Sequence, residues 1–251
     1  MPKFNVKNAQ IHCETLGQPG GQAFFWAHGW GHSHENLLPL ARALEASGYH
    51  TVVDFPGFGA SPPPPEVWDT AAYADAVADI IKAQNTGPVI WIGHSFGGRV
   101  GLQLASRHPE LVKGMFLIAA AGLKRKRPLW QKIYFKLRIL TYKALKKFLP
   151  QEMLDKKFGA SDYRKTSGVM RGVFVNVVNE NQTDTAAAVQ CPVHLVYGAN
   201  DTETPPEIGE RLARLIPNAK LTVLDGQDHY SVLSSGRHPV IGLLGKFIKQ
   251  L

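Results

Sequence analysis

Residues 89–100, which read VIWIGHSFGGRV, constrain the fold of this chain more than any other stretch. The first four residues form a continuous apolar, β-rich run, as in a strand buried on both faces of a parallel sheet, and a helical pattern follows from Phe96. The turn between them, GHSFG, fits the pattern G-x-S-x-G. A strand that turns directly into a helix around one serine strains that serine and exposes its hydroxyl above the sheet edge. Ser95 is therefore a candidate nucleophile, and the alternative is a glycine-rich turn in which Ser95 only caps the helix.

Strand-like and helix-like segments alternate along most of the chain. The expected strands span residues 4–6, 9–14, 23–27, 49–53, 89–92, 112–119, 193–197 and 221–224. The expected helices span residues 36–47, 70–84, 97–107 and 207–216, with a closing helix from about Pro239. This alternation predicts an α/β fold with a mostly parallel, doubly wound sheet and right-handed crossovers. A chain of 251 residues is long enough for one such domain with an inserted segment.

The alternation is interrupted over residues 123–185, where no run resembles a core strand. We expect a helical cap there, inserted into a core formed by residues 1–122 and 186–251. Apolar residues recur at steps of three and four on one face of an expected helix, namely Trp130, Ile133, Leu137, Leu140, Ala144 and Phe148. A basic stripe, formed by Lys132, Lys136, Lys143 and Lys147, follows another face.

The charge of the chain is concentrated in the same segment. Residues 124–165 contain 14 Lys or Arg and only 3 Asp or Glu, in a chain whose net charge is +8. Three interpretations stay open for the stripe: a solvated helix face, attraction of an anionic substrate or carrier, and weak contact with an acidic membrane surface. The sequence contains no aromatic stacking platform and no nucleic-acid-binding motif, so we expect no nucleic-acid partner.

The N-terminus lacks the apolar segment of a signal peptide, and no run reaches the roughly 18 apolar residues of a membrane span. We therefore expect a cytoplasmic protein. Cys13 and Cys191 lie beside expected strands without metal-ligand spacing, which favours buried, structural thiols, and nothing else in the sequence suggests a metal site. Asp54 begins a loop rich in Gly and Pro, where we expect its carboxylate to cap backbone N–H groups.

The sequence HGWG, residues 28–31, follows the expected strand 23–27. Its glycines allow the backbone to turn an N–H outward, as an oxyanion hole requires. The expected donors are the backbone N–H groups of Trp30 and Phe96. The alternative is a simple turn in which His28 is a structural histidine.

A serine hydroxyl needs a base to become nucleophilic at neutral pH, and the base needs an acid to fix its tautomer. Ser95, Asp201 and His229 each follow the end of an expected strand, so a parallel sheet brings them to one edge. Their order along the chain is the one expected when the serine lies in such a turn. Asp201 is preferred over the other nearby acids, which are Glu203, Asp225 and Asp228. We expect His94 to pack beside the turn or to orient it.

Five segments, HGWG, DFPGFGAS, GHSFGG, GANDTETP and GQDHYS, occur in this order and together resemble the α/β-hydrolase fold family. The chain is most similar to its capped, carboxylesterase-like branch. The resemblance implies that Ser95 is the nucleophile, His229 the general base and acid, and Asp201 its orienting partner. It also implies that the N–H groups of Trp30 and Phe96 hold the oxyanion. An acyl-enzyme would be hydrolysed by water with no cofactor.

The resemblance also narrows the activity. Haloalkane dehalogenases and epoxide hydrolases of this family carry aspartate at the position of Ser95. Ring-cleavage hydrolases usually carry asparagine and tryptophan where this chain has His94 and Tyr230. We therefore expect a hydrolase of a small carboxylic ester, thioester or lactone, with lid side chains such as Trp130, Tyr134 and Phe174 shaping the pocket. The alternatives are a carbon–carbon bond hydrolase, a cofactor-free haloperoxidase or lyase, and a non-catalytic ligand receptor.

Overall fold

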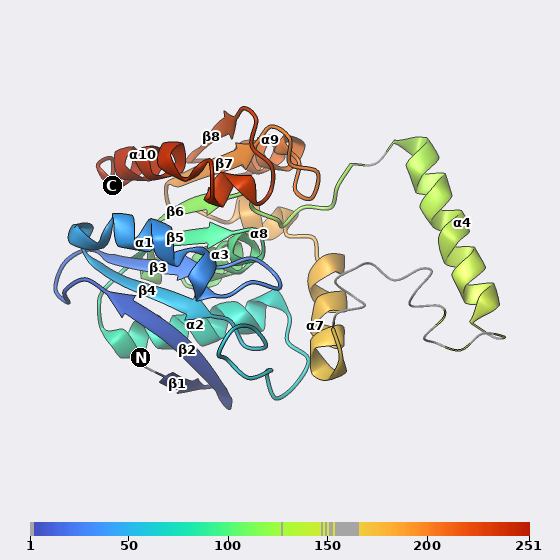
Figure 1. Ribbon diagram of the computed structural model, residues 1–251, viewed down its shortest axis with the longest axis horizontal. Helices are drawn as coiled ribbons and strands as arrows, with labels where there is room; N and C mark the ends of the chain where they lie inside the picture. The colour runs from blue at the N-terminus through green and yellow to red at the C-terminus, as the bar shows by residue number, and fades with distance from the viewer. Residues whose placement is uncertain (1–2, 127, 147, 149, 151–152, 154–165) are drawn as a thin grey trace.

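The computed structural model describes residues 3–126, 128–146, 148, 150, 153 and 166–251. Its centre is an eight-stranded sheet in the order β1-β2-β4-β3-β5-β6-β7-β8 (Figure 1). The strands are β1 (Lys3–Val6), β2 (Ala9–Leu16), β3 (Ala23–Ala27), β4 (Tyr49–Asp54), β5 (Val89–His94), β6 (Val112–Ile118), β7 (Val193–Gly198) and β8 (Ala219–Leu224). Strand β2 is antiparallel to both of its neighbours, and all other pairs are parallel. The predicted mostly parallel sheet is confirmed.

Helices cover both faces of the sheet, as a doubly wound fold requires (Figure 1). One face packs against α1 (Leu38–Ala43) and α10 (Arg237–Ile248), with Leu40 and Leu244 fully buried. The other packs against α2 (Thr70–Gln84), α3 (Phe96–Arg107) and α9 (Pro206–Leu215). Within the described residues, short 3-10 helices join these elements: η1 (His34–Asn36), η2 (Glu45–Ser47), η3 (Pro109–Leu111) and η4 (Ser231–Leu233).

The prediction of a single helix over residues 36–47 was wrong. The chain forms η1, the six-residue α1 and η2 in succession. Pro39 lies in the first turn of α1, where a missing N–H costs nothing. A continuous helix from residue 36 would need a hydrogen-bond donor at this position, and proline has none. The segment is therefore helical, as its periodicity predicts, but it is divided into three short helices.

Between β6 and β7 the described residues form α4 (Leu129–Leu145), α7 (Gly168–Asn179) and α8 (Thr183–Ala187), and no strand. Helix α7 lies beside the core, whereas α4 extends away from it (Figure 1). Many apolar side chains of α4 are more than half exposed; these are Leu129, Trp130, Ile133, Tyr134, Leu137, Ile139 and Leu140. Of the predicted basic stripe, Lys136 and Lys143 are exposed. The side chain of Lys132 and the whole of Lys147 lie outside the described part of the chain.

A buried polar cluster fastens the end of α7 to the core. The carboxylate of Glu180, which follows α7, accepts hydrogen bonds from the hydroxyl of Thr70 on α2 and from Gln103 Nε2 on α3. Gln182 Nε2 donates to Thr70 Oγ1 at 2.9 Å and to the Arg99 carbonyl at 3.2 Å. Burying polar groups costs little when they are paired in this way. The segment that contains α7 is therefore anchored at its C-terminal end.

The two thiols are free. Cys13 is buried, as expected, whereas Cys191 is only half-buried and packs against the core. Among the described residues, no helix combines the length and the apolar character needed to cross a bilayer.

Candidate active site

Ser95 occupies the sharp turn between β5 and α3. Its φ of 49° and ψ of −105° lie in a sparsely populated region, and such strain costs of order 1–3 kcal/mol. Two backbone bonds hold the turn: the Ser95 N–H donates to the Ile118 carbonyl at 3.0 Å, and the Ser95 carbonyl accepts the Gly98 N–H at 3.0 Å. The turn passes so close to β3 that a Cβ on Gly97 would lie 2.1 Å from the Ala27 carbonyl oxygen. This close approach explains the second glycine of G-x-S-x-G.

Asp201 and His229 form a buried hydrogen-bonded pair at the same edge of the sheet. Asp201 follows β7, His229 follows β8, and His229 Nδ1 donates to Asp201 Oδ2 at 2.8 Å. The other carboxylate oxygen accepts the backbone N–H groups of Glu203 and Thr204, each at 2.8 Å. The Thr204 hydroxyl lies 2.9 Å from Asp201 Oδ2 and 3.0 Å from His229 Nδ1.

These bonds keep Asp201 ionised. Burial alone would raise the pKa of Asp201, but hydrogen bonds from His229 and Thr204 outweigh burial and hold that pKa below its ordinary value. A carboxylate in this position fixes the proton of His229 on Nδ1. The other ring nitrogen, Nε2, is then free to accept a proton.

Ser95 and His229 line one cavity of about 550 Å³. Trp30 and Phe58 of the core line it, and so does Met170 of α7. Within the described part of the chain, no hydrogen bond reaches Ser95 Oγ. His229 Nε2 instead lies 3.7 Å from Glu203 Oε2, whose partner oxygen accepts a hydrogen bond from the Tyr230 hydroxyl at 2.8 Å.

Two backbone N–H groups border the serine without a partner among the described residues. They belong to Trp30, in the loop after β3, and to Phe96, the first residue of α3. The first N–H groups of a helix have no partner within the helix, and the helix dipole favours negative charge there. Their role as oxyanion donors stays a prediction.

His28 braces this loop. Its Nδ1–H donates to the Gly29 carbonyl at 2.7 Å, and its Nε2 accepts the Phe55 N–H at 3.1 Å. The His28 carbonyl accepts the Gly97 N–H at 3.0 Å, which ties the loop to the serine turn. Burial lowers the pKa of His28 to about 4, so the ring is neutral at physiological pH. His28 is thus a structural histidine within a segment that also offers the Trp30 N–H.

His94 lies against His229, with 4.9 Å between the ring centroids. Its Nε2–H donates to the His229 carbonyl at 3.0 Å, so His94 orients the backbone of the histidine segment. Burial, reinforced by the charge of His229, lowers the pKa of His94 to about 3. A pKa this low makes His94 a weak base, in keeping with the packing or orienting place expected for it.

The other acids near the site have different partners. Asp228 caps the turn after it by accepting the N–H groups of Tyr230 and Ser231. Asp225 is exposed. Asp54 accepts the Ala60 N–H at 2.9 Å, in agreement with the expected capping role. Glu203 was considered only as a rival to Asp201, and its place near His229 Nε2 was missed.

The cavity wall contains an aromatic group centred on Trp30. The Trp30 ring lies 4.9 Å from that of Phe58, 5.5 Å from Phe96 and 5.2 Å from Phe174 of α7. Phe174 therefore meets the core as expected. Trp130 and Tyr134 do not line the cavity and are 66% and 55% exposed, because α4 stands away from the core.

Comparisons with known proteins agree with this fold. A model of the alpha/beta hydrolase family matches residues 24–242. The pimeloyl-[acyl-carrier protein] methyl ester esterase of Chromobacterium violaceum is 30% identical, over 89% of this chain and 92% of that protein. A thermophilic esterase from Thermogutta terrifontis superposes with a TM-score of 0.73 at 19% identity, over 99% of this chain and 98% of that chain. The enol-lactonase from Burkholderia xenovorans gives a TM-score of 0.77 at 17% identity, over 99% and 100% of the two chains.

The two solved structures are distant in sequence and bear on the fold. The family model spans most of the chain, and the Chromobacterium violaceum relative, an esterase, aligns over nearly its full length. The predictions of an α/β-hydrolase fold and of an enzyme that acts on esters are confirmed. This chain belongs to the α/β hydrolase family.

Proposed function

We propose that this protein hydrolyses a carboxylic ester through an acyl-enzyme formed on Ser95. His229 acts as general base and then as general acid, and Asp201 orients it. The observation that carries this assignment is the 2.8 Å bond between His229 Nδ1 and Asp201 Oδ2, at the wall of a cavity that also contains the strained Ser95. A receptor would have no use for an ionised buried acid that holds a histidine in one tautomer.

The chemistry follows from the proton positions. His229 Nε2 takes the proton of Ser95 Oγ as that oxygen attacks the carbonyl carbon of the ester. The resulting oxyanion accepts hydrogen bonds from the N–H groups of Trp30 and Phe96, each of which is worth about 10²–10³ in rate. His229 then gives its proton to the departing alcohol, which leaves the acyl group on Ser95. Water attacks this acyl-enzyme by the same route in reverse, and the carboxylic acid departs.

Nε2 must leave the neighbourhood of Glu203 to reach the serine. In the free enzyme it lies 3.7 Å from Glu203 Oε2 and makes no hydrogen bond to Ser95 among the described residues. Such catalytic bonds are often long in free enzymes and tighten when substrate binds.

We also propose that residues 123–185 form a cap over the cavity. Ser167 and Met170 line the cavity, and Phe174 packs on Trp30. The cap would give the site an apolar acyl pocket and exclude water from it. The ester is therefore expected to have an apolar acyl chain.

A substrate attached to an acidic carrier protein is a more specific candidate. The Chromobacterium violaceum relative is named for an ester on an acyl-carrier protein. In this chain, exposed basic side chains follow β6 and continue along α4; they belong to Lys124, Arg125, Lys126, Lys136, Lys143 and Lys146. A basic surface next to a cap steers an acidic partner toward the site.

The direct experiment compares Ser95→Ala with the unchanged enzyme on p-nitrophenyl esters of graded acyl length. The variant should lose hydrolysis at every length while its circular dichroism stays the same. Turnover that persists in the variant would contradict the role of Ser95. The best acyl length then reports the depth of the pocket.

The carrier is tested separately with methyl esters of a dicarboxylic acyl chain, free or attached to an acyl-carrier protein. Reversing three charges on α4 and at its C-cap, in the variant K136E/K143E/K146E, should lower kcat/KM for the carrier-linked ester and leave the free ester unchanged. Equal effects on both substrates would contradict recognition of an acyl-carrier protein. Binding of the protein to anionic vesicles that falls with salt would instead support contact with an acidic membrane surface, because exposed charges are screened over about 8 Å at physiological ionic strength.

A cytoplasmic location and the absence of a nucleic-acid partner stay predictions from the sequence. Cofactor-free haloperoxidase chemistry is checked by a halogenation assay in acetate with peroxide. Carbon–carbon bond hydrolysis is checked with a ring-cleavage product as substrate.

A further inference from the structure

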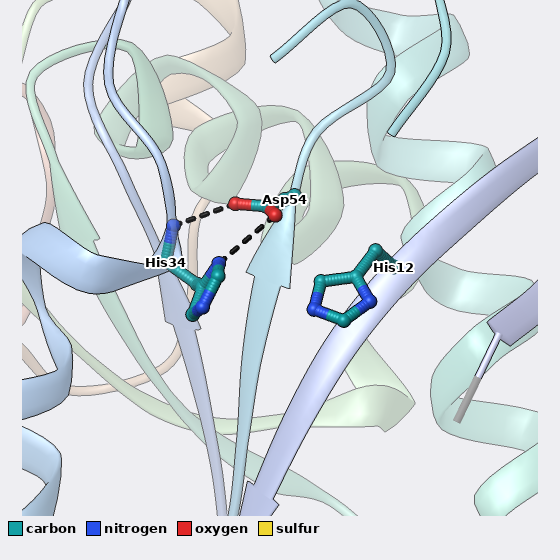
Figure 2. A group of neighbouring side chains, drawn as sticks. All are labelled: His12, His34 and Asp54. Carbon is teal, nitrogen blue, oxygen red and sulfur yellow. Dashed lines mark hydrogen bonds and ion pairs between the residues drawn. The ribbon is translucent and has the colours of Figure 1, made fainter. Parts of the chain in front are cut away.

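Two histidines and an aspartate from distant parts of the sequence meet beside the C-terminal end of strand β4 (Figure 2). His12 lies on β2, His34 in η1, and Asp54 at the last position of β4. One nitrogen of each histidine and one carboxylate oxygen lie within 4.8 Å of one another. Asp54 is fully buried, His12 is buried and His34 is half-buried. The group is mostly buried and contains three potential metal ligands.

The hydrogen bonds of this group leave one ligand unused. Asp54 accepts the backbone N–H of His34 at 2.6 Å and His34 Nδ1–H at 2.9 Å (Figure 2). Among the described residues, the imidazole of His12 makes no hydrogen bond and only packs edge-on against the His34 ring, with 5.2 Å between centroids. In the same described part of the chain, no Lys or Arg pairs with the buried Asp54 carboxylate. The Asp54 carboxylate also accepts the Ala60 N–H at 2.9 Å, so it is bonded only to N–H groups, and a cation beside the His12 ring would stabilise its charge.

We propose that His12, His34 and Asp54 bind a divalent transition-metal ion, with Zn²⁺ as the representative. Two imidazole nitrogens and one carboxylate oxygen suit zinc, cobalt or nickel better than calcium or magnesium, which prefer oxygen alone. Glu14 Oε2, 3.5 Å from His34 Nε2, is a further oxygen near the group. A metal bound at His34 Nδ1 would replace the proton there, and the neutral ring would carry its one proton on Nε2, 3.5 Å from Glu14 Oε2.

The donors must close slightly around the ion. Ligands of tetrahedral zinc lie about 3.3 Å apart at bond lengths of about 2.0 Å, so the widest pair approaches by up to ~1.5 Å. Rotation of the His12 ring supplies this movement without breaking a hydrogen bond of that ring. The His34–Asp54 pair, already at 2.9 Å, needs to open only slightly.

The site would be structural. None of its three residues lines the active-site cavity, but both attached loops do: residues 29–32 precede His34, and residues 57–59 follow Asp54. A metal ion would join β2, β4 and η1 and would hold the loop that presents the Trp30 N–H. The hydrolytic chemistry itself does not pass through it.

The test uses untagged protein stripped with a chelator and titrated with ZnCl₂ by calorimetry, with CoCl₂ absorption as a spectroscopic probe. The unchanged protein should bind one equivalent, show visible d–d bands with Co²⁺, and unfold at a higher temperature with Zn²⁺ than without it. His12→Gln should weaken Zn²⁺ binding by about 100-fold or more, since even outer-shell changes cost 10–100-fold. Its melting temperature without metal should change little, because the His12 ring makes no hydrogen bond in the described part of the chain.

The matched control is His108→Gln, which removes a half-buried histidine that also lies beside a carboxylate, Asp75, at 3.0 Å. This variant should bind Zn²⁺ as the unchanged protein does. Failure of the unchanged protein to bind Zn²⁺ would overturn the proposal and leave His34–Asp54 as a loop-fastening hydrogen bond. Equal Zn²⁺ affinity in His12→Gln would overturn it too, since the ion would then lie elsewhere.

Discussion

Acidification should destabilise this protein through two buried histidines of the active-site region. Burial lowers the pKa of His28 to about 4 and that of His94 to about 3, from 6.5 in an unfolded chain. The folded state therefore binds fewer protons than the unfolded state once the pH falls below 6.5. Stability is lost from there downward, and the loss levels off only near the two folded values.

The magnitude follows from these values. At pH 5, protonation of one free histidine stabilises the unfolded chain by about 1.4 kcal/mol for each of the 1.5 pH units below 6.5, or ~2 kcal/mol. His28 and His94 together then cost ~4 kcal/mol, a large part of the 5–15 kcal/mol that stabilises a typical domain. For His28 the reason is geometric, because protonated Nε2 could no longer accept the Phe55 N–H.

The assay is urea unfolding, followed by tryptophan fluorescence, at pH 7 and pH 5. The quantity compared is the loss of unfolding free energy between the two pH values, so that any effect of a substitution at pH 7 cancels. His28→Gln and His94→Gln should each reduce this loss by ~2 kcal/mol. His238→Gln, which removes an exposed histidine of α10, is the matched control and should not change it. An undiminished loss in both buried variants would refute the reasoning.

Three further changes probe the site and its supports. Asp201→Asn should lower kcat by about 10⁴ with little change in KM, because the histidine loses its tautomer, whereas Asp228→Asn, at a residue that only caps a turn, should stay within about twofold. Gly97→Ala should lower the free energy of unfolding by ~2 kcal/mol or more, since its Cβ would meet a carbonyl oxygen of β3 at 2.1 Å. Gly242→Ala, on α10, should instead stabilise the protein by up to ~1 kcal/mol, because the added Cβ would meet no neighbouring side chain or other element within 4 Å. Urea unfolding measures the free energy of unfolding of both variants. Glu180→Gln should lower the free energy of unfolding by about 1–3 kcal/mol in the same assay, because the buried guanidinium of Arg99 on α3 loses its ionic partner.

The sheet and the serine turn could be predicted because local sequence determines them. An apolar run such as residues 89–92 can only be buried, and the glycines beside Ser95 are required by close backbone contacts that any such turn makes. Parallel strands end at one edge of the sheet, and this is enough to predict that Asp201 and His229 lie close together.

Other features depend on packing that has no local pattern. The apolar spacing of α4 predicted a helix correctly. The spacing does not show whether the apolar face packs on the core, and in the structure α4 extends away from it. Glu203 and Thr204 reach His229 because the loop after β7 folds back on Asp201, which the sequence does not encode as a motif. Similarly, His12 and Asp54 are brought together by the register of two antiparallel strands, in which they are direct partners.

The central claim is that Ser95 is made nucleophilic by His229 and Asp201. Its most direct measurement is covalent labelling with a fluorophosphonate probe, followed by mass spectrometry of the peptide that carries the adduct. We expect one adduct per chain, located on Ser95, and a strongly reduced labelling rate in His229→Gln. An adduct on another residue, no adduct at all, or equally fast labelling without the histidine would contradict it.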